Sequence, residues 1–88
     1  MTAPQFEALR HAVNEVLATR HPTALSDAAI GRRIVALQLV DFAFESSALR
    51  SALEFLRDKG LVRAQPDALG STFYWTATAE GQLAYERQ

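Results

Sequence analysis

The sequence LRSALEFLRDKGLVRAQPDALGSTFYWTATAEG, residues 49–81, decides the fold of this chain. It begins with Leu49, Leu53 and Leu56, which recur at helical spacing and form one apolar face. Gly60 follows, and glycine is the residue that most readily adopts the left-handed conformation that closes many helices. The first part of this sequence therefore predicts a helix that ends at the glycine.

The second part of the same sequence predicts a β-hairpin. Residues 61–63 favour a strand, residues 66–71 hold the proline, aspartate and glycine typical of a turn, and residues 73–77 form an aromatic strand. Side chains alternate along a strand, so Phe73 and Trp75 lie on one face, which we expect to be buried with the following alanine. Residues 78–81 then open a closing helix.

The residues before this stretch predict one long helix and a short strand. Pro4 suits a first helical turn, and Pro22 ends the helix, because the residue before a proline avoids the helical region. Residues 23–25 are a candidate third strand that pairs with the hairpin. Ser26 is a good N-cap for a second helix, and Asp27 suits the positive end of that helix.

The second helix and the connection after it supply further apolar side chains. Ile30, Ile34 and Leu37 form the expected buried face of the helix. In residues 39–45 apolar and polar positions alternate over too short a span to predict a strand. We expect this segment to be an ordered connection whose aromatic side chains fold back onto the core.

The order and character of these elements resemble the winged-helix superfamily. The resemblance covers about residues 25–83, and its best parts are LRSALEFLRDKGLVR at residues 49–63 and FYWTATAEG at residues 73–81. These are similar to the recognition helix, wing strands and closing helix of small bacterial transcriptional regulators. The resemblance implies an α+β fold with a three-helix core, a short first strand, a two-stranded wing and a C-terminal helix. The connection around Asp41 and Phe42 is longer and more aromatic than the tight turn usual in helix-turn-helix proteins.

The resemblance also implies a DNA-binding surface. In the DNA-binding members the third helix, here predicted over about residues 46–59 with Ser46 or Ser47 as its cap, enters the major groove of double-stranded DNA. Serine and arginine side chains suit base edges and phosphates. The candidate DNA-binding residues are Ser47, Arg50 and Ser51 on the third helix, Arg32 and Arg33 on the second, and Arg63 on the first wing strand.

Charge supports a different class of function. The formal net charge is −1 and the pI about 6.1, so no basic field surrounds the chain. Glu54 and Asp58 share the outward face of the third helix, and the wing tip carries Asp67 and no cation. The alternative hypothesis is a winged-helix module that binds another protein instead of DNA. The candidate partner interface consists of Phe42, Phe44 and Phe55.

Composition sets the remaining expectations. The 88 residues suit a single domain, residues 1–88, and the chain has no cysteine. Nothing in the sequence indicates a catalytic site, a metal site or a cofactor, so we expect no enzyme activity. The N-terminal residues suggest neither a signal peptide nor a membrane span, so we expect a cytoplasmic protein. We also expect a homodimer, because regulators that recognise palindromic sites are two-fold symmetric.

Overall fold

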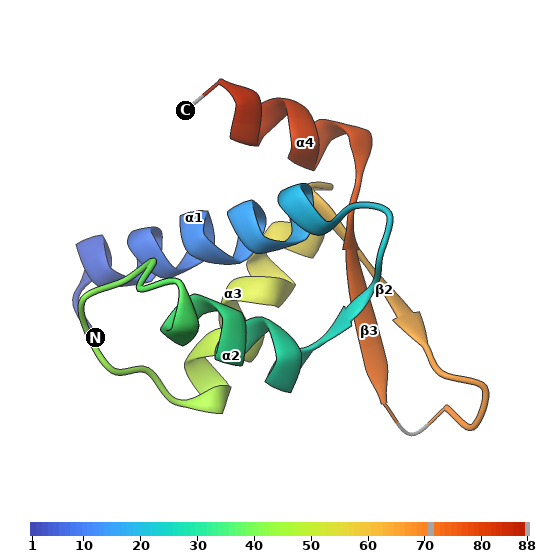
Figure 1. Cartoon of the computed structure of the whole chain (residues 1–88), viewed down its shortest axis with the longest axis horizontal. Helices are drawn as coiled ribbons and strands as arrows, with labels where there is room; N and C mark the ends of the chain where they lie inside the picture. The colour runs from blue at the N-terminus through green and yellow to red at the C-terminus, as the bar shows by residue number, and fades with distance from the viewer. Residues whose placement is uncertain (71, 88) are drawn as a thin grey trace.

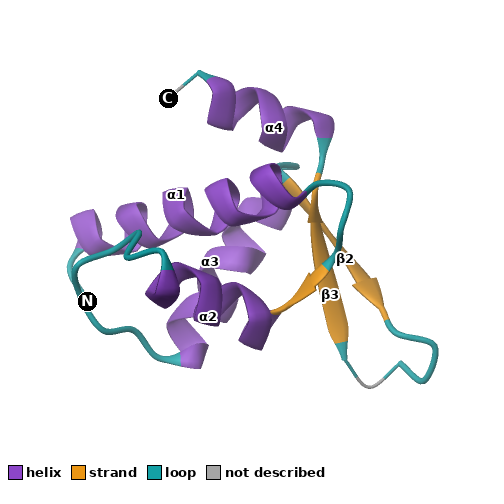
Figure 2. Ribbon diagram, in the orientation of Figure 1, coloured by secondary structure: helices purple, strands orange, loops and turns teal. Residues whose placement is uncertain are grey.

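The computed structural model describes residues 1–70 and 72–87, which form four helices and one three-stranded sheet (Figures 1 and 2). The elements are α1 (Ala3–Arg20), β1 (Leu25–Ser26), α2 (Asp27–Ala36), α3 (Ser46–Asp58), β2 (Val62–Pro66), β3 (Phe73–Ala77) and α4 (Ala79–Glu86). The predicted order of elements and the α+β class are confirmed. Ser71, the last residue of the predicted turn, lies outside the described residues.

The core lies where the first three helices meet β3. α1 crosses the molecule, α2 and α3 pack against it, and the β2–β3 hairpin extends past the helices at its turn (Figure 1). The largest side chains with almost no exposed surface come from all of these elements: Leu9, Val13, Val16, Leu17, Ile30, Ile34, Leu53 and Trp75. Their burial is the main source of stability in so short a chain.

Both ends of α1 follow from local sequence. Thr2 and Gln5 form a capping box, in which each side chain accepts a hydrogen bond from the other residue's backbone N–H. Pro4 lies in the first turn, where its missing N–H costs nothing. The helix ends at Arg20, just before the predicted stop at Pro22.

The sheet has the strand order β1-β3-β2, with both neighbours antiparallel to β3. Trp75 pairs with Leu25 in β1 and with Ala64 in β2. The predicted third strand is confirmed, although it is only two residues long, Leu25–Ser26. β3 therefore has a neighbour on each side, which fixes the position of Trp75 within the domain.

Burial along β3 differs from the predicted alternation. Trp75 is 1% exposed, as expected, but Phe73 is 43% exposed, and its expected burial is wrong. Phe73 pairs with Pro66 at the outer end of the hairpin, beyond the covering helices. Thr76 is buried although alternation places it on the outer face. Position along the strand decides burial here, because the inner half of the central strand is covered on both faces.

α2 ends one residue before the predicted buried Leu37. Leu37 is the C-cap and is 57% exposed, so its expected burial is wrong. Gln38 adopts a left-handed backbone conformation, with φ 52°. Its backbone N–H donates a hydrogen bond to the carbonyl of Val35, and the N–H of Leu39 donates one to the carbonyl of Ile34. This Schellman arrangement turns the chain so that Leu39 packs on the core in place of Leu37.

α3 ends in the same way at the predicted glycine. Gly60 has φ 77° and donates to the carbonyl of Arg57, and the N–H of Leu61 donates to the carbonyl of Leu56. The predicted left-handed end of the helix is confirmed. Glycine adopts this backbone without the steric cost that a Cβ imposes. β2 begins two residues later, at Val62.

Residues 37–45 form the predicted ordered connection between α2 and α3. Phe42 and Phe44 are half-buried and pack against the core, as do Leu39 and Val40. This confirms that the aromatic side chains fold back, and it places the start of α3 beside α2.

Asn14 on α1 is a buried polar residue that ties α4 to the core. Its side-chain amide donates a 3.1 Å hydrogen bond to the carbonyl of Gly81. A Cβ at Gly81 would collide with the carbonyl oxygen of Leu61, so only glycine permits this close approach. Thr78 caps α4 by accepting a hydrogen bond from the N–H of Gly81, and the predicted start of the closing helix is confirmed.

The two Schellman ends give a paired test of the fold. We expect Gly60→Ala to lower the free energy of unfolding by about 1 kcal/mol, because alanine disfavours the left-handed backbone. Gln38→Gly removes the same strain from α2 and should leave stability unchanged or raise it by up to about 1 kcal/mol. Chemical denaturation measures both. A Gly60→Ala variant as stable as the wild type would show that α3 continues past its assigned end.

Candidate nucleic-acid interface

The outward face of α3 is the surface that the winged-helix resemblance assigns to DNA. The leucines at positions 49, 53 and 56 are buried and attach the helix to the core. The side chains that point away from the core are exposed and polar: Ser46, Ser47, Ser51, Glu54 and Asp58. α3 therefore presents an open polar face along its length.

The N-terminus of α3 differs from the predicted cap. Glu45 is the N-cap, with an extended backbone at φ −95° and ψ 163°, and its side chain makes no capping hydrogen bond. The predicted cap at Ser46 or Ser47 is wrong, because both serines already lie within the first helical turn. Both remain exposed at the positive end of the helix dipole.

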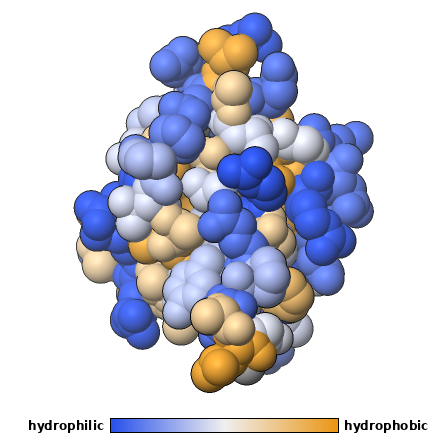
Figure 3. All heavy atoms as spheres, turned by 90° about the vertical axis from the view of Figure 1, so that its right-hand side faces the viewer, coloured by the Kyte–Doolittle hydropathy of each residue, from blue (hydrophilic) through white to orange (hydrophobic). Residues whose placement is uncertain are grey.

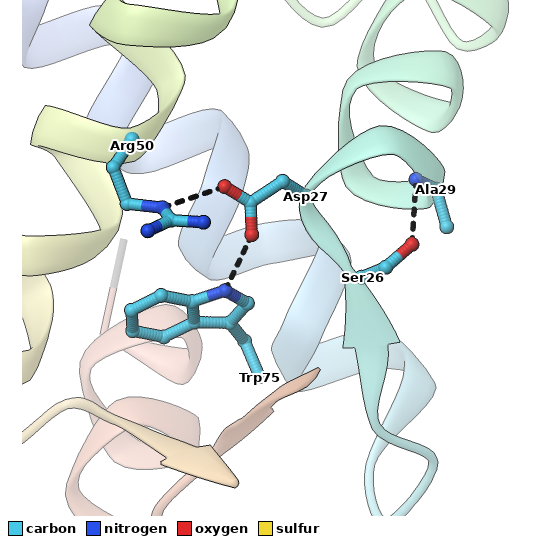
Figure 4. A network of polar contacts seen from close by, with 5 residues as sticks. All are labelled: Ser26, Asp27, Ala29, Arg50 and Trp75. Carbon is cyan, nitrogen blue, oxygen red and sulfur yellow. Dashed lines mark hydrogen bonds and ion pairs between the residues drawn. The ribbon is translucent and has the colours of Figure 1, made fainter. Parts of the chain in front are cut away.

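Asp27, the first residue of α2, joins three elements through its carboxylate (Figure 4). Oδ1 accepts a 2.6 Å hydrogen bond from the indole Nε1–H of Trp75 in β3. Oδ2 accepts a 2.7 Å hydrogen bond from the Nε–H of Arg50 in α3. Ser26 caps α2 beside it by accepting from the N–H of Ala29, which fixes the backbone that carries the carboxylate.

Each partner has a reason to make these contacts. A buried indole N–H needs an acceptor, and Asp27 supplies one to Trp75. A carboxylate at the first residue of a helix is also favoured by the helix dipole. Because the side chain of Arg50 is 43% exposed, solvent screens its ion pair, which contributes less than a buried pair would. The hydrogen bond to Trp75 is the better-protected half of the network.

Arg50, a candidate DNA-binding residue on α3, is held in place by contacts with Asp27 and Trp75. Its guanidinium carbon lies 5.8 Å from the centroid of the Trp75 ring. The hydrogen bond that Arg50 donates to Asp27 raises the pKa of Arg50, an effect that partial burial opposes, and the nearby Glu54 adds to the increase. Within the described residues its two terminal nitrogens make no hydrogen bond. The N–H groups of the two terminal nitrogens of Arg50 therefore remain available as hydrogen-bond donors.

Sequence reasoning did not predict the central place of Asp27. The sequence placed Asp27 only at the positive end of the α2 dipole. Its two partners are distant in sequence, because 23 residues separate it from Arg50 and 48 separate it from Trp75. The available signal was the single tryptophan of the chain. A tryptophan expected in the core requires a buried acceptor, and an aspartate beside the expected partner strand is the nearest candidate.

The two arginines of α2 lie close to each other but differ in exposure. Arg32 is exposed and Arg33 is half-buried. Both line a shallow hollow formed with Leu25 and with two alanines of the same helix. Arg32 also lines a groove that includes Asp27, so it is the α2 arginine nearer to the network.

Arg63 lies on a different surface from Arg50. It pairs with Thr76, whereas its neighbour Ala64 pairs with Trp75. Adjacent residues point to opposite faces of a sheet, so Arg63 leaves the sheet away from Trp75 and its Arg50 contact. The structure therefore does not unite all the predicted DNA-binding residues.

Phe42 and Phe44 line an apolar groove between α2, the connection and the start of α3. The groove has a volume of about 830 Å³ and includes Val35, which is 66% exposed, and Leu49. Its charged lining residues are one aspartate and one arginine. A second hollow, of about 440 Å³, lies on the other side of Phe44, towards the N-terminus of α1.

Phe55 does not join this groove. Its ring lies between two cations, with the Arg10 guanidinium 3.9 Å and the Lys59 ammonium 5.5 Å from its centroid. It lines a separate hollow with residues of α1 and α4. The three phenylalanines of the predicted partner interface therefore belong to two surfaces, because α3 carries Phe55 away from the connection.

The face around the wing is mostly hydrophilic. Figure 3 views the molecule from the wing side and shows polar residues over most of this face, with small apolar areas at its upper and lower ends. Leu69 at the wing tip is exposed. No lysine or arginine occurs in residues 64–73, so the tip of the wing offers no cation to a phosphate backbone.

Comparison with solved structures identifies the fold. No family model and no curated protein matches the chain. A Clostridium thermocellum transcriptional regulator, Cth-833, has a TM-score of 0.78 at 15% identity, covering 99% of this chain and 82% of that chain. An apo mutant of Lactococcus lactis ZitR has a TM-score of 0.71 at 15% identity, covering 97% and 57%. The Streptomyces coelicolor regulator PcaV, solved with its natural ligand, has a TM-score of 0.69 at 22% identity. The match covers 99% of this chain and 52% of that chain.

These similarities and the observed order of elements show that the chain has the winged-helix fold. The chain spans a little more than half the length of ZitR and PcaV. Among the described residues, no helix is long and apolar enough to cross a membrane, and no cluster of histidine, aspartate or glutamate is suited to hold a metal ion.

The Asp27 network gives a test by double-mutant cycle. We expect Asp27→Ala to lower the free energy of unfolding by about 2–3 kcal/mol, because it leaves the buried N–H of Trp75 unpaired and frees Arg50. In a Trp75→Phe background the same change should cost about 1 kcal/mol less, since no buried donor remains. Denaturation of the four proteins measures the coupling.

Asp41→Ala is the matched control, because Asp41 is exposed and lies in the connection. It should change stability by less than about 0.5 kcal/mol. Strictly additive effects of Asp27→Ala and Trp75→Phe would contradict the hydrogen bond between the two residues.

Proposed function

We propose that this protein binds double-stranded DNA as a transcriptional regulator, with α3 in the major groove. The observation that carries the proposal is the polar face of α3 on a winged-helix fold. Ser47 and Ser51 are exposed on that face, and Arg50 has two unpaired terminal nitrogens beside them. The solved structures with a similar fold also include transcriptional regulators.

The charges around α3 favour base contacts over phosphate contacts. Arg32 and Arg33 on α2 are the cations best placed to reach a phosphate backbone beside the groove. Glu54 and Asp58 on the polar face of α3 repel it, and Arg57 is already paired with Asp58 at 3.5 Å. Non-specific affinity comes mainly from neutralised phosphates, so we expect weak binding to random DNA.

The proposal includes a homodimer. A two-fold symmetric pair doubles the number of base contacts on a palindromic site, which compensates for few phosphate contacts per chain. With two cations per chain, Arg32 and Arg33, near phosphates, the logarithm of the binding constant should fall by about 2 per chain for each tenfold increase in salt.

A protein-binding function is the alternative, and one observation favours it. The groove of about 830 Å³ beside Phe42 and Phe44 is mostly apolar and has an exposed valine at its edge. Exposed apolar surface of this kind marks many protein interaction sites. This function needs no basic surface, and it predicts that the chain binds no duplex at low salt.

Replacement of Glu54 separates the two functions. We expect Glu54→Gln to strengthen binding to random duplex DNA by about threefold to tenfold at low salt, because it removes one charge that repels phosphates. The gain should shrink at physiological salt, where screening is stronger. Fluorescence anisotropy with labelled duplexes measures both conditions.

Glu86→Gln is the matched control, since Glu86 is exposed at the end of α4 on another element. It should alter binding less than Glu54→Gln does. If neither the wild type nor Glu54→Gln binds any duplex at low salt, the DNA-binding function is wrong and the groove becomes the surface to test.

A further inference from the structure

We infer that Asp27 is a positioning residue for Arg50, which it presents end-on to a guanine base. This inference rests on the DNA-binding function proposed above and assigns a base to one contact of that surface. Three observations support it. Asp27 occupies one nitrogen of Arg50, the carboxylate of Asp27 offsets the charge of Arg50, and Trp75 holds Asp27 in place.

The hydrogen bond to Asp27 decides which edge of the guanidinium remains available. An arginine binds an acceptor pair either side-on, through Nε and one terminal nitrogen, or end-on, through both terminal nitrogens. Asp27 occupies Nε at 2.7 Å, which removes the side-on approach. Both terminal nitrogens are unpaired within the described residues. The end-on pair matches the O6 and N7 acceptors of guanine in the major groove.

The charge of Asp27 favours a base over a phosphate as the partner of Arg50. Phosphate binding depends on net positive charge, which the adjacent carboxylate largely cancels. Recognition of a base edge depends on the direction of the N–H donors, which the carboxylate fixes. Arg50 should therefore contribute sequence preference and little salt dependence, unlike the exposed Arg32 on α2.

The network also reduces the entropic cost of ordering Arg50 on DNA. The second oxygen of Asp27 is bound to the indole N–H of Trp75, which is itself fixed in the core (Figure 4). The guanidinium lies 5.8 Å from the same indole ring. A side chain ordered before binding loses less rotamer freedom on binding. Arg57 on the same helix has only an exposed aspartate beside it, at 3.5 Å.

Selection of binding sites from a randomised duplex library tests this inference. For the wild type we expect one position per half-site with a guanine preference of about tenfold or more. Asp27→Asn should reduce that preference by about tenfold, because the neutral amide holds Nε less firmly, while binding to random duplex should become stronger, because no carboxylate then offsets the charge of Arg50. Arg50→Lys should lose the same preference, since lysine has no planar fork.

Arg57→Lys is the matched control, because it makes the same replacement on the same helix at an arginine outside the network. It should leave the preferred sequence unchanged. Arg50→Lys leaves Asp27 and Trp75 intact, so it tests the contact even if Asp27→Asn does not fold. Melting temperatures of all variants identify any that are unfolded.

The outcomes distinguish this inference from the function on which it rests. If the wild type selects no duplex, both are wrong. If the wild type selects a site and Asp27→Asn or Arg50→Lys retains its guanine preference, only the positioning role is wrong. A uniform loss of affinity for all sequences in Asp27→Asn, with the preference retained, would show that Asp27 acts only on stability.

Discussion

The carboxylate of Asp27 is the point at which the helices and the sheet of this domain are tied together. Asp27 is the first residue of α2. Its carboxylate accepts hydrogen bonds from the indole N–H of the buried Trp75 in β3 and from the Nε–H of Arg50 in α3. Apolar packing alone is non-directional and tolerates small rotations of a helix. The two hydrogen bonds of 2.6 and 2.7 Å to one carboxylate are directional, so they add a specific contact of α2 with α3 and with β3.

The same constraint determines what kind of surface α3 offers. A winged helix with a basic surface gains affinity from many phosphates, whereas this chain has a net charge of −1 and a wing tip without cations. Arg50 on α3 forms an ion pair with Asp27, and within the described residues only its terminal donors are unpaired. For the proposed DNA-binding function we therefore expect weak non-specific binding and recognition through a few directed contacts. The apolar groove beside Phe44 is a second surface with different chemistry.

Sequence reasoning predicted the features that depend on neighbouring residues. Gly60 and Pro22 mark helix ends through their own backbone preferences, and Trp75 is buried as strand alternation requires. It could not predict the exposure of Phe73, which depends on how far the hairpin extends past the helices. Nor could it predict the Asp27 network, because contacts across 23 and 48 residues leave no periodic pattern in the sequence. The separation of Phe55 from Phe44 likewise depends on the tertiary position of α3.

The most direct test of this account is hydrogen exchange of two side-chain protons, followed by nitrogen-resolved NMR. The single tryptophan gives one indole signal, and the Nε–H of Arg50 is compared with that of Arg57 on the same helix. The account predicts that the Trp75 indole proton is protected and that the Arg50 Nε–H exchanges about tenfold more slowly than the Arg57 Nε–H. Equal exchange at Arg50 and Arg57, together with an unprotected indole, would contradict it.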